Sequence, residues 1–477
     1  MGRTKIVATI GPSSDTPDII KRLLEAGMNV ARLNFSHGDH AYHARNIATL
    51  RNVANQMNHP LAILQDLQGP KIRTGLLVDG GPVTLQTGQR FVLTTQSDII
   101  GNAEGVSISY AALAEEVEPG DRILVSDGLI ELRVLQSAGN RIETEIVRGG
   151  SLRQRQGVNL PGVKIRTPAL TAKDIDDLEF GLEHGVEYIA LSFVRQAADI
   201  EDLKGRIAAA GKQTPVIAKI EKPEALEHFG AILQVTDGVM IARGDLGVEI
   251  SPELVPSIQK QLIRAANVAC VPVITATQML ESMINQPQPT RAETSDVANA
   301  ILDGTDAVML SGETAAGHFP VDSVQTMHRI AEMAEQHGWQ YMAQDRAKLD
   351  IGQQRTVPRA ISAAARALVD AVDVQAIVAF TMSGNTARLL SHQRPMIPII
   401  AITPSEDVWR RLSLLWGVTA MRSPFLETDE ALNAHIQHLM AETGLASAGD
   451  LVVVVGGHPT GAAMPTNVVR VLQIESS

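Results

Sequence analysis

Short apolar runs alternate with helical patterns at a near-regular interval along this 477-residue sequence, and this alternation constrains the fold more than any other feature. A parallel strand that is buried on both faces reads as a continuous apolar run, and a helix follows it in α/β folds. Eight such runs therefore predict a (β/α)8 barrel. The runs cover residues 4–10, 30–35, 61–64, 188–194, 215–220, 238–242, 271–276 and 306–310.

The regular interval breaks between about residues 70 and 164, where short strand-like runs are separated by turn signals such as Asp79-Gly80-Gly81 and Gly139-Asn140. Hairpins require such turns. We expect residues 71–164 to form a small inserted β-barrel domain that acts as a lid on the catalytic rim. The barrel then covers residues 1–70 and 165–343, and residues 344–477 form a C-terminal open α/β domain, because apolar runs and helical patterns alternate again there.

Composition excludes several classes of partner. With 44% hydrophobic residues the chain is an ordinary globular protein, and a formal net charge of −12 disfavours nonspecific binding to nucleic acid or anionic membranes. The single cysteine, Cys270, stands in an apolar setting that is typical of a core position. No stretch approaches the ~18 apolar residues of a membrane span, and the first residues lack a signal-peptide pattern, so we expect a cytoplasmic protein.

Polar residues close most of the predicted barrel strands. The carboxyl ends of barrel strands meet at one face, so these side chains are expected to converge on one pocket. They are Arg32, Asn34, Ser36, Asp66, Ser192, Lys219, Glu221, Arg243, Asp245 and Thr277. The recurrence of cations, carboxylates and hydroxyls at this one edge favours an active site over solvated strand ends.

Two carboxylates among these residues predict a metal site. Alternate side chains of a strand share a face, so Lys219 and Glu221 point the same way, and Asp245 on the next strand can complete a two-carboxylate magnesium site. A metal with an ammonium beside it suits chemistry on a phosphorylated acid. The sequence contains neither a GxxxxGK[ST] loop nor a GxGxxG fingerprint, so a bound nucleotide must be held by side chains and metal.

Several long stretches closely resemble the signature motifs of pyruvate kinases. They are TKIVATIGPS (4–13), NVARLNFSHG (29–38), AKIEKPE (218–224), ARGDLG (242–247) and TATQMLESM (275–283). The resemblance covers essentially the whole chain. It implies a barrel with an inserted lid and a C-terminal effector domain, and a reaction that moves a phosphoryl group from phosphoenolpyruvate to ADP and then protonates the enolate.

The resemblance also implies roles for individual residues. Glu221 and Asp245 would hold Mg2+, with Mn2+ as an alternative ion, while Lys219 lies over the transferring phosphoryl group and Arg32 makes a second phosphate contact. Thr277 would bind substrate and deliver the proton, through a water relay because a hydroxyl is a weak acid. Further substrate contacts would come from Ser192, Arg243 and Gly244, and nucleotide contacts from Asn34, His37, Arg73 and the lid residue Asp127. The family resemblance also implies a homotetramer.

One motif departs from the potassium-dependent pattern of the family. Asn34, Ser36 and Asp66 match three potassium ligands, but Lys71 stands where that pattern has a glutamate. A tethered ammonium can supply the charge of the ion, so we expect activity that does not require potassium. The alternative is a solvated surface lysine. Gln156 also stands where many relatives have a lysine near the nucleotide.

The C-terminal region carries a candidate effector loop. The loop is rich in hydroxyls and precedes a helical run, and helix amino termini bind phosphate well. Its residues are Thr381, Ser383, Gly384, Asn385 and Thr386. The loop resembles the family's effector phosphate loop, so a sugar-phosphate activator is expected there. However, residues 456–461 lack the arginine that bisphosphate-responsive relatives often carry, and a plain helix cap is the alternative.

Two other functions remain open from the residues alone. A magnesium-dependent aldolase or lyase on a related barrel would also stabilise an enolate, but it needs neither the inserted domain nor a lysine over a phosphoryl group. A non-catalytic sugar-phosphate sensor would use only the C-terminal domain. The intact set of rim residues argues against the sensor.

Overall fold

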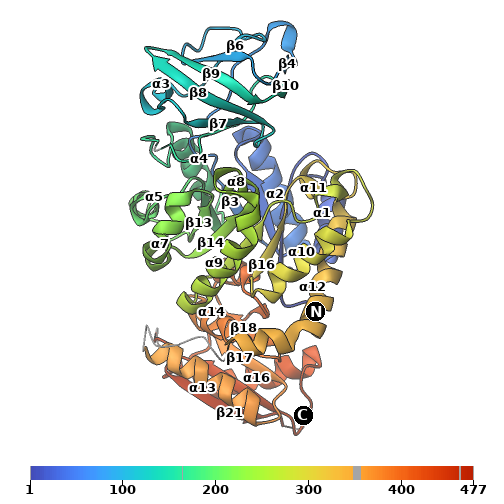
Figure 1. Ribbon diagram of the computed structural model, residues 1–477. Helices are drawn as coiled ribbons and strands as arrows, with labels where there is room; N and C mark the ends of the chain where they lie inside the picture. The colour runs from blue at the N-terminus through green and yellow to red at the C-terminus, as the bar shows by residue number, and fades with distance from the viewer. Residues whose placement is uncertain (1, 164, 347–355, 461–463, 476–477) are drawn as a thin grey trace.

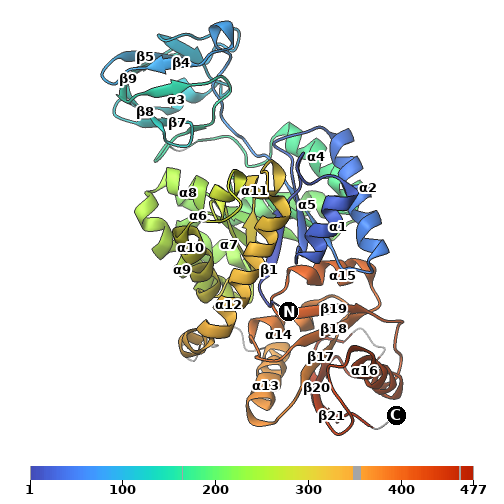
Figure 2. The ribbon, with the colours of Figure 1, turned by 90° about the vertical axis from the view of Figure 1, so that its right-hand side faces the viewer.

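The computed structural model describes residues 2–163, 165–346, 356–460 and 464–475. The inserted β domain lies at one end of the barrel and the C-terminal domain at the opposite end (Figure 1), and a view turned by 90° shows the same order (Figure 2). The predicted three-part architecture is confirmed. The carboxyl ends of the barrel strands face the lid domain, which is our name for the inserted β domain.

Eight parallel strands close the barrel, in the order β1-β16-β15-β14-β13-β12-β3-β2. Each corresponds to one of the predicted apolar runs, and nearly every side chain in them is buried, as expected for strands covered on both faces. The strands are β1 (Lys5–Thr9), β2 (Val30–Asn34), β3 (Ala62–Asp66), β12 (Tyr188–Leu191), β13 (Val216–Ile220), β14 (Gly238–Ala242), β15 (Val273–Ala276) and β16 (Ala307–Leu310).

Helices with well-marked ends surround the barrel. Thr16 caps the first by accepting a hydrogen bond from the Ile19 N–H, Pro17 occupies its first position, and Gly27 follows its end with a φ of 111°. Capping boxes begin α4 and α10. The helices are α1 (Pro17–Glu25), α2 (His40–Gln56), α4 (Ala172–Glu183), α5 (Ala197–Ala209), α6 (Pro223–Glu227), α7 (Phe229–Val235), α8 (Arg243–Glu249), α9 (Val255–Ala269), α10 (Arg291–Leu302), α11 (Gly312–Ala315) and α12 (Pro320–Arg346).

The lid domain follows β3 and contains a six-stranded sheet, in the order β11-β7-β8-β9-β5-β6, beside the pair β10-β4. Four of its strands have only two or three residues, too few for a full periodic pattern in the sequence: β4 (Val83–Leu85), β6 (Gly105–Ser107), β10 (Gly150–Leu152) and β11 (Val158–Asn159). The others are β5 (Arg90–Thr94), β7 (Arg122–Val125), β8 (Ile130–Ala138) and β9 (Arg141–Arg148), with one short helix α3 (Leu113–Glu116). A hydrophobic cluster between Ile72 and Val163 forms its own core.

The C-terminal domain is the predicted open α/β sheet. Its strand order is β19-β18-β17-β20-β21, with all neighbours parallel except the edge strand β21. Two separate apolar clusters include side chains of alternate residues along β17, as expected for a sheet packed on both faces. The elements are α13 (Val357–Ala371), β17 (Ala376–Phe380), α14 (Asn385–His392), β18 (Ile399–Thr403), α15 (Glu406–Arg411), β19 (Val418–Arg422), α16 (Asp429–Thr443), β20 (Leu451–Gly456) and β21 (Val468–Gln473).

The C-terminal domain covers the amino ends of the barrel strands. The Lys5 ammonium donates to the Val418 carbonyl at 2.8 Å, and the Tyr188 hydroxyl donates to the Arg411 carbonyl at 2.8 Å. Lys5 and Tyr188 are the first residues of β1 and β12. This face of the barrel is therefore occupied by the C-terminal domain.

A buried arginine joins the same two parts. Arg394 is fully buried, pairs with Asp306 at 2.6 Å, donates to the Gly304 carbonyl at 2.9 Å and stacks over the Trp416 ring at 4.6 Å. Asp306 immediately precedes β16, so the ion pair crosses from the C-terminal domain into the barrel.

The exact domain boundaries stay predictions. Position 164 lies outside the described residues, and α12 continues past position 343 to Arg346. Among the described residues, no helix combines the length and the apolar character that crossing a membrane requires.

Candidate active site

Four predicted site residues meet at the carboxyl ends of the barrel strands. The Lys219 ammonium lies 2.9 Å from Glu221 Oε1 and 3.2 Å from Asp66 Oδ1. It also donates to the Ser192 hydroxyl at 2.7 Å, and that hydroxyl donates to the Leu67 carbonyl. Residues at the end of β3 and in the segments that follow β12 and β13 thus hold one ammonium group in a fixed position.

Arg32 extends this cluster on β2. Its Nε lies 2.7 Å from Asp66 Oδ2, and its Nη1 donates to the Thr9 hydroxyl at 2.9 Å. Burial opposes ionisation of Asp66, but the Lys219 ammonium and the Arg32 guanidinium outweigh it and lower the pKa of this carboxyl. Burial likewise opposes the charge of Lys219, but Asp66 and Glu221 outweigh it and raise the pKa of Lys219. Both groups therefore carry their charge at neutral pH.

Glu221 and Asp245 lie close enough to interact electrostatically. Burial raises the pKa of Glu221 and the charge of Asp245 adds to this effect, although Lys219 and the Phe193 N–H, which donates to Glu221 Oε2 at 3.0 Å, act in the opposite direction. A buried carboxylate with a second carboxylate close by forms a donor set suited to a divalent cation.

Asp245 does not lie on a strand as predicted, but is partly exposed in the first turn of α8, which follows β14 directly. Within the described residues its carboxylate has no hydrogen bond or ion pair, so its oxygens are available to a metal ion. No group of three or more His, Cys, Asp or Glu suited to a metal ion occurs in the same residue ranges. Two protein carboxylates completed by substrate and water oxygens are typical of magnesium sites.

Thr277 follows β15 in a strained conformation. Its φ of 69° is rare for a β-branched residue, and such strain is concentrated at functional sites. The hydroxyl donates to the Ala276 carbonyl at 2.6 Å and accepts from the Gly244 N–H at 2.7 Å. Thr277 therefore adjoins the first turn of α8, which also carries Asp245.

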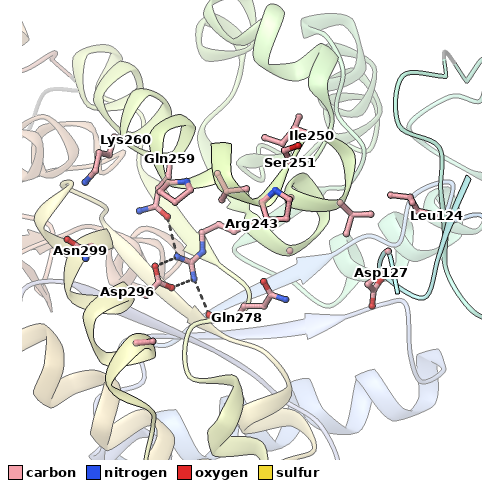
Figure 3. Close-up of a pocket in the computed structure, with 18 of the residues that line it drawn as sticks. Leu124, Asp127, Arg243, Ile250, Ser251, Gln259, Lys260, Gln278, Asp296 and Asn299 are labelled. Carbon is pink, nitrogen blue, oxygen red and sulfur yellow. Dashed lines mark hydrogen bonds and ion pairs between the residues drawn. The ribbon is translucent and has the colours of Figure 1, made fainter. Parts of the chain in front are cut away.

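Arg243 has its guanidinium directed to protein partners. It pairs with Asp296 at 2.7 Å and also donates to Gln259 and to the carbonyls of Thr277 and Gln278 (Figure 3). These bonds fix the backbone that presents Thr277. A direct substrate contact would require the guanidinium to leave these partners, so the predicted substrate contact of Arg243 stays a prediction.

A cleft of about 990 Å³ lies between the lid and the barrel. Asp127, exposed in the β7–β8 turn with a φ of 54°, lines it from the lid, and Gly244 and Gln278 line it from the barrel (Figure 3). Asp127 thus lies across the cleft from the helix that carries Asp245, and its role toward the nucleotide stays a prediction.

The other predicted nucleotide contacts gather near the two connections of the lid. The His37 side chain reaches solvent, but neighbouring protein atoms partly desolvate its ring, and this desolvation together with the charges of Arg73, Lys71 and Arg32 lowers its pKa. This places three cations around His37. Asn34 accepts a hydrogen bond from the Ser36 N–H at 3.1 Å, so both residues belong to the same turn after β2.

Lys71 is exposed at the start of the lid. A Cβ at Gly157 would lie 3.7 Å from its Cε, and within the described residues its ammonium has no hydrogen bond or ion pair. The replacement of potassium by this ammonium stays a prediction.

The candidate effector loop precedes α14. Gly384, with a φ of 85°, donates its N–H to the Thr381 hydroxyl, and the Thr386 hydroxyl bonds to that of Thr466 at 2.7 Å. Ser383 is exposed, and the Asn385 side chain accepts from Arg388 at 2.7 Å. Ser383 is thus available to a ligand, and its effector role stays a prediction. Gly461, in the segment without arginine, lies outside the described residues.

Two contacts of the site escape the sequence analysis. Thr9 ends β1 and bonds to Arg32, and the rule that selects polar residues at strand ends would also have selected it. Glu313 accepts from the Leu280 and Ser311 N–H groups behind β15 and β16, and no pattern in the sequence indicates this.

Comparisons with known proteins agree with this geometry. A family model described as pyruvate kinase, barrel domain, matches residues 1–324, and one described as pyruvate kinase, alpha/beta domain, matches residues 359–472. Pyruvate kinase 2 of Synechocystis is 48% identical, covering 98% of this chain and 79% of that protein, and the pyruvate kinase of Agrobacterium vitis is 45% identical, covering 100% and 97%.

A solved structure gives the same result. The crystal structure of a pyruvate kinase from Cryptosporidium parvum has a TM-score of 0.93 and 37% identity, and the match covers 99% of this chain and 96% of that one. Sequence and fold thus match over nearly the full length of both proteins. The chain belongs to the pyruvate kinase family.

Proposed function

We propose that this pyruvate kinase transfers the phosphoryl group of phosphoenolpyruvate to ADP at the cluster around Lys219, in a reaction that depends on a divalent cation. The observation that carries the proposal is the Lys219 ammonium, 2.9 Å from Glu221 and 3.2 Å from Asp66 at the open end of the barrel. Phosphoryl transfer depends mainly on positioning and on neutralising charge, and a fixed, desolvated ammonium supplies both.

Glu221 and Asp245 would hold the cation, Mg2+ or Mn2+, because they combine mutual electrostatic contact with free carboxylate oxygens on Asp245. When bound, the ion would act as a Lewis acid toward phosphoryl and enolate oxygens. The raised pKa of Glu221 predicts how metal affinity depends on pH. The affinity decreases as the pH falls toward that pKa, because the protonated carboxyl cannot bind the ion.

The side chains around this pair have separate tasks. Lys219 stabilises charge on the migrating phosphoryl group, Ser192 orients its ammonium, and Arg32, held by Asp66 and Thr9, supplies a second positive charge. The N–H groups in the first turn of α8 are suited to an anionic carboxylate, although that of Gly244 already donates to the Thr277 hydroxyl.

Protonation of the enolate involves Thr277. Its hydroxyl already donates to the Ala276 carbonyl, so a water molecule relays the proton.

ADP would lie between the rim and the lid. Asn34, His37 and Arg73 would contact its phosphates from one side, and Asp127 would approach from the lid across the cleft. Gln156, bonded to the Ser126 hydroxyl at 2.7 Å, supplies no positive charge here.

A coupled assay tests the function directly. ATP formation from phosphoenolpyruvate and ADP in the presence of Mg2+, and its loss when a chelator removes the ion, is the expected result. An aldolase or lyase would cleave or release an enolate without forming ATP. A non-catalytic sensor would form no ATP, whether or not Lys219 is substituted.

We expect activity without added potassium. When potassium is replaced by tetramethylammonium, the unmodified enzyme should keep its kcat. The kcat of Lys71→Glu should fall roughly 100-fold and recover when potassium is restored. Steady-state kinetics with both cations measure this. A fall of similar size in the unmodified enzyme would show that Lys71 is only a solvated surface lysine.

We expect a sugar phosphate to bind the loop before α14 and to activate the enzyme. Ser383→Ala should weaken binding about tenfold, because a hydrogen bond to a charged group is lost. Isothermal titration with monophosphate and bisphosphate sugars measures this, with Ser447→Ala as a control elsewhere in the same domain. The absence of heat from every sugar phosphate would leave the loop as a simple helix cap.

The remaining proposals are a homotetramer and a cytoplasmic location, both of which rest on the family. Light scattering of the purified chain measures the first, and a mass of one or two chains would contradict it.

A further inference from the structure

Glu249, at the end of α8, joins three parts of the molecule. Its side chain is only 5% exposed, and its Oε1 accepts from the Lys222 ammonium at 2.7 Å and from the Asn159 amide at 3.0 Å. Asn159 belongs to lid strand β11, whereas Lys222 and Glu249 belong to the barrel. We call these three residues the lid–barrel junction. None of them is among the residues predicted for the site.

The barrel side of the junction adjoins the predicted metal ligands. Lys222 follows Glu221 directly, and its ammonium lies 5.5 Å from the centroid of the Phe193 ring, while the Phe193 N–H donates to Glu221 at 3.0 Å. Asp245 and Glu249 are four residues apart on α8, so they lie on the same side of the helix, one turn apart. The junction therefore holds the end of the helix that presents Asp245.

The lid side of the junction leads to Asp127. In the lid sheet Asn159 pairs with Leu124 and Val158 pairs with Val125, and Asp127 follows two residues after Val125. Leu124 and Asp127 both line the cleft opposite α8 (Figure 3). The Asn159 amide is thus linked to Asp127 by one short pair of strands.

A carboxylate suits this position for a physical reason. The Lys222 ammonium is largely buried, with a side chain 10% exposed, and a buried ammonium requires an opposite charge. The second bond, from a neutral amide to the same ionised oxygen, is stronger than a bond between neutral groups. The lid is thereby attached to a charge that the barrel itself holds in place.

We propose that Glu249 is a positioning residue for phosphoryl transfer: by bonding to Asn159 and Lys222 together, it aligns Asp127 of the lid with the amino-terminal turn of α8. The proposal rests on the proposed function, because it assumes that nucleotide binds between these two elements. Phosphoenolpyruvate, held by barrel residues alone, does not depend on the junction, whereas ADP does.

The variant Asn159→Ala separates these two effects. It removes the lid's donor and leaves the ion pair of Lys222 with Glu249 intact. We expect a higher KM for ADP and a lower kcat. Together they should reduce kcat/KM for ADP by roughly 10- to 100-fold, as a misalignment of about 1 Å can produce. The KM for phosphoenolpyruvate should change less than about twofold, which a general loss of structure would not allow.

A second variant covers the case in which the alanine protein does not fold. Asn159→Asp has the same shape but places a like charge opposite Glu249, so the effect on the KM for ADP should exceed that of alanine. The double variant that combines Asn159→Asp with Glu249→Gln should have a KM for ADP no higher than that of Glu249→Gln alone, because both changes break the same contact. Arg90→Ala, an exposed lid residue paired with Glu143 at 3.5 Å, is the control and should leave all constants unchanged.

The outcomes are distinct. Unchanged ADP kinetics in both Asn159 variants, or equal changes in the KM values for ADP and phosphoenolpyruvate, would overturn the role of the junction. Failure of the unmodified enzyme to form ATP would instead overturn the proposed function.

Discussion

Lys219→Met is expected to lower kcat for ATP formation by about 1000-fold or more, which is the scale of removing a positioned positive group from a phosphoryl-transfer site. Methionine keeps most of the side-chain volume but removes the charge that lies 2.9 Å from Glu221 and 3.2 Å from Asp66. The ammonium has no substitute at that point, because Arg32 bonds to the other oxygen of Asp66.

Steady-state kinetics at saturating substrates measure this loss. Lys21→Met is a matched control, since Lys21 is exposed on α1 and its ion pair with Glu25 is long, at 4.0 Å. A thermal melt of each variant shows whether the fold is retained. A kcat within tenfold of the unmodified enzyme, in a folded protein, would contradict the proposed role of Lys219.

Arg394→Met is expected to reduce stability by roughly 3–5 kcal/mol, the range found when one partner of a buried ion pair is removed. Arg394 is fully buried and pairs with Asp306 at 2.6 Å, so the substitution removes a buried positive charge beside this carboxylate. The bond to the Gly304 carbonyl and the stacking on Trp416 are lost as well.

Urea and thermal midpoints measure this effect. Adding Asp306→Asn to the variant should recover part of the loss, because it removes the negative charge that Arg394 balances while keeping an acceptor for the Val273 N–H. Arg422→Met is the control: this arginine also lies over a tryptophan, Trp409 at 5.8 Å, but it is half exposed. An equal shift in both arginine variants would show that stacking, and not the buried ion pair, provides the stability.

The fold was accessible from the sequence because two simple patterns determine it. Strands buried on both faces produce unbroken apolar runs, and all eight of these runs form barrel strands. Short lid strands such as Val158–Asn159 have no such pattern and depend on pairing with distant neighbours. The family resemblance drawn from the motifs is confirmed by the matches to known pyruvate kinases.

The site was predictable to the extent that topology determines it. Strand ends must meet at one face, which brings Arg32, Asp66, Lys219 and Glu221 together. Contacts between side chains far apart in the sequence follow no periodicity. The bond from Lys222 to Glu249 spans 27 positions, and only the position of α8 beside the residues that follow β13 reveals it. For the same reason the identity of Lys71 does not determine where its ammonium lies.

The lid has a hydrophobic core of its own, with no residue in common with the barrel clusters. Substitutions inside it therefore leave the packing of the catalytic strands unaltered. During evolution such a module can change its side of the proposed nucleotide cleft while the barrel side is preserved, so nucleotide preference and phosphoenolpyruvate turnover are free to diverge at different rates.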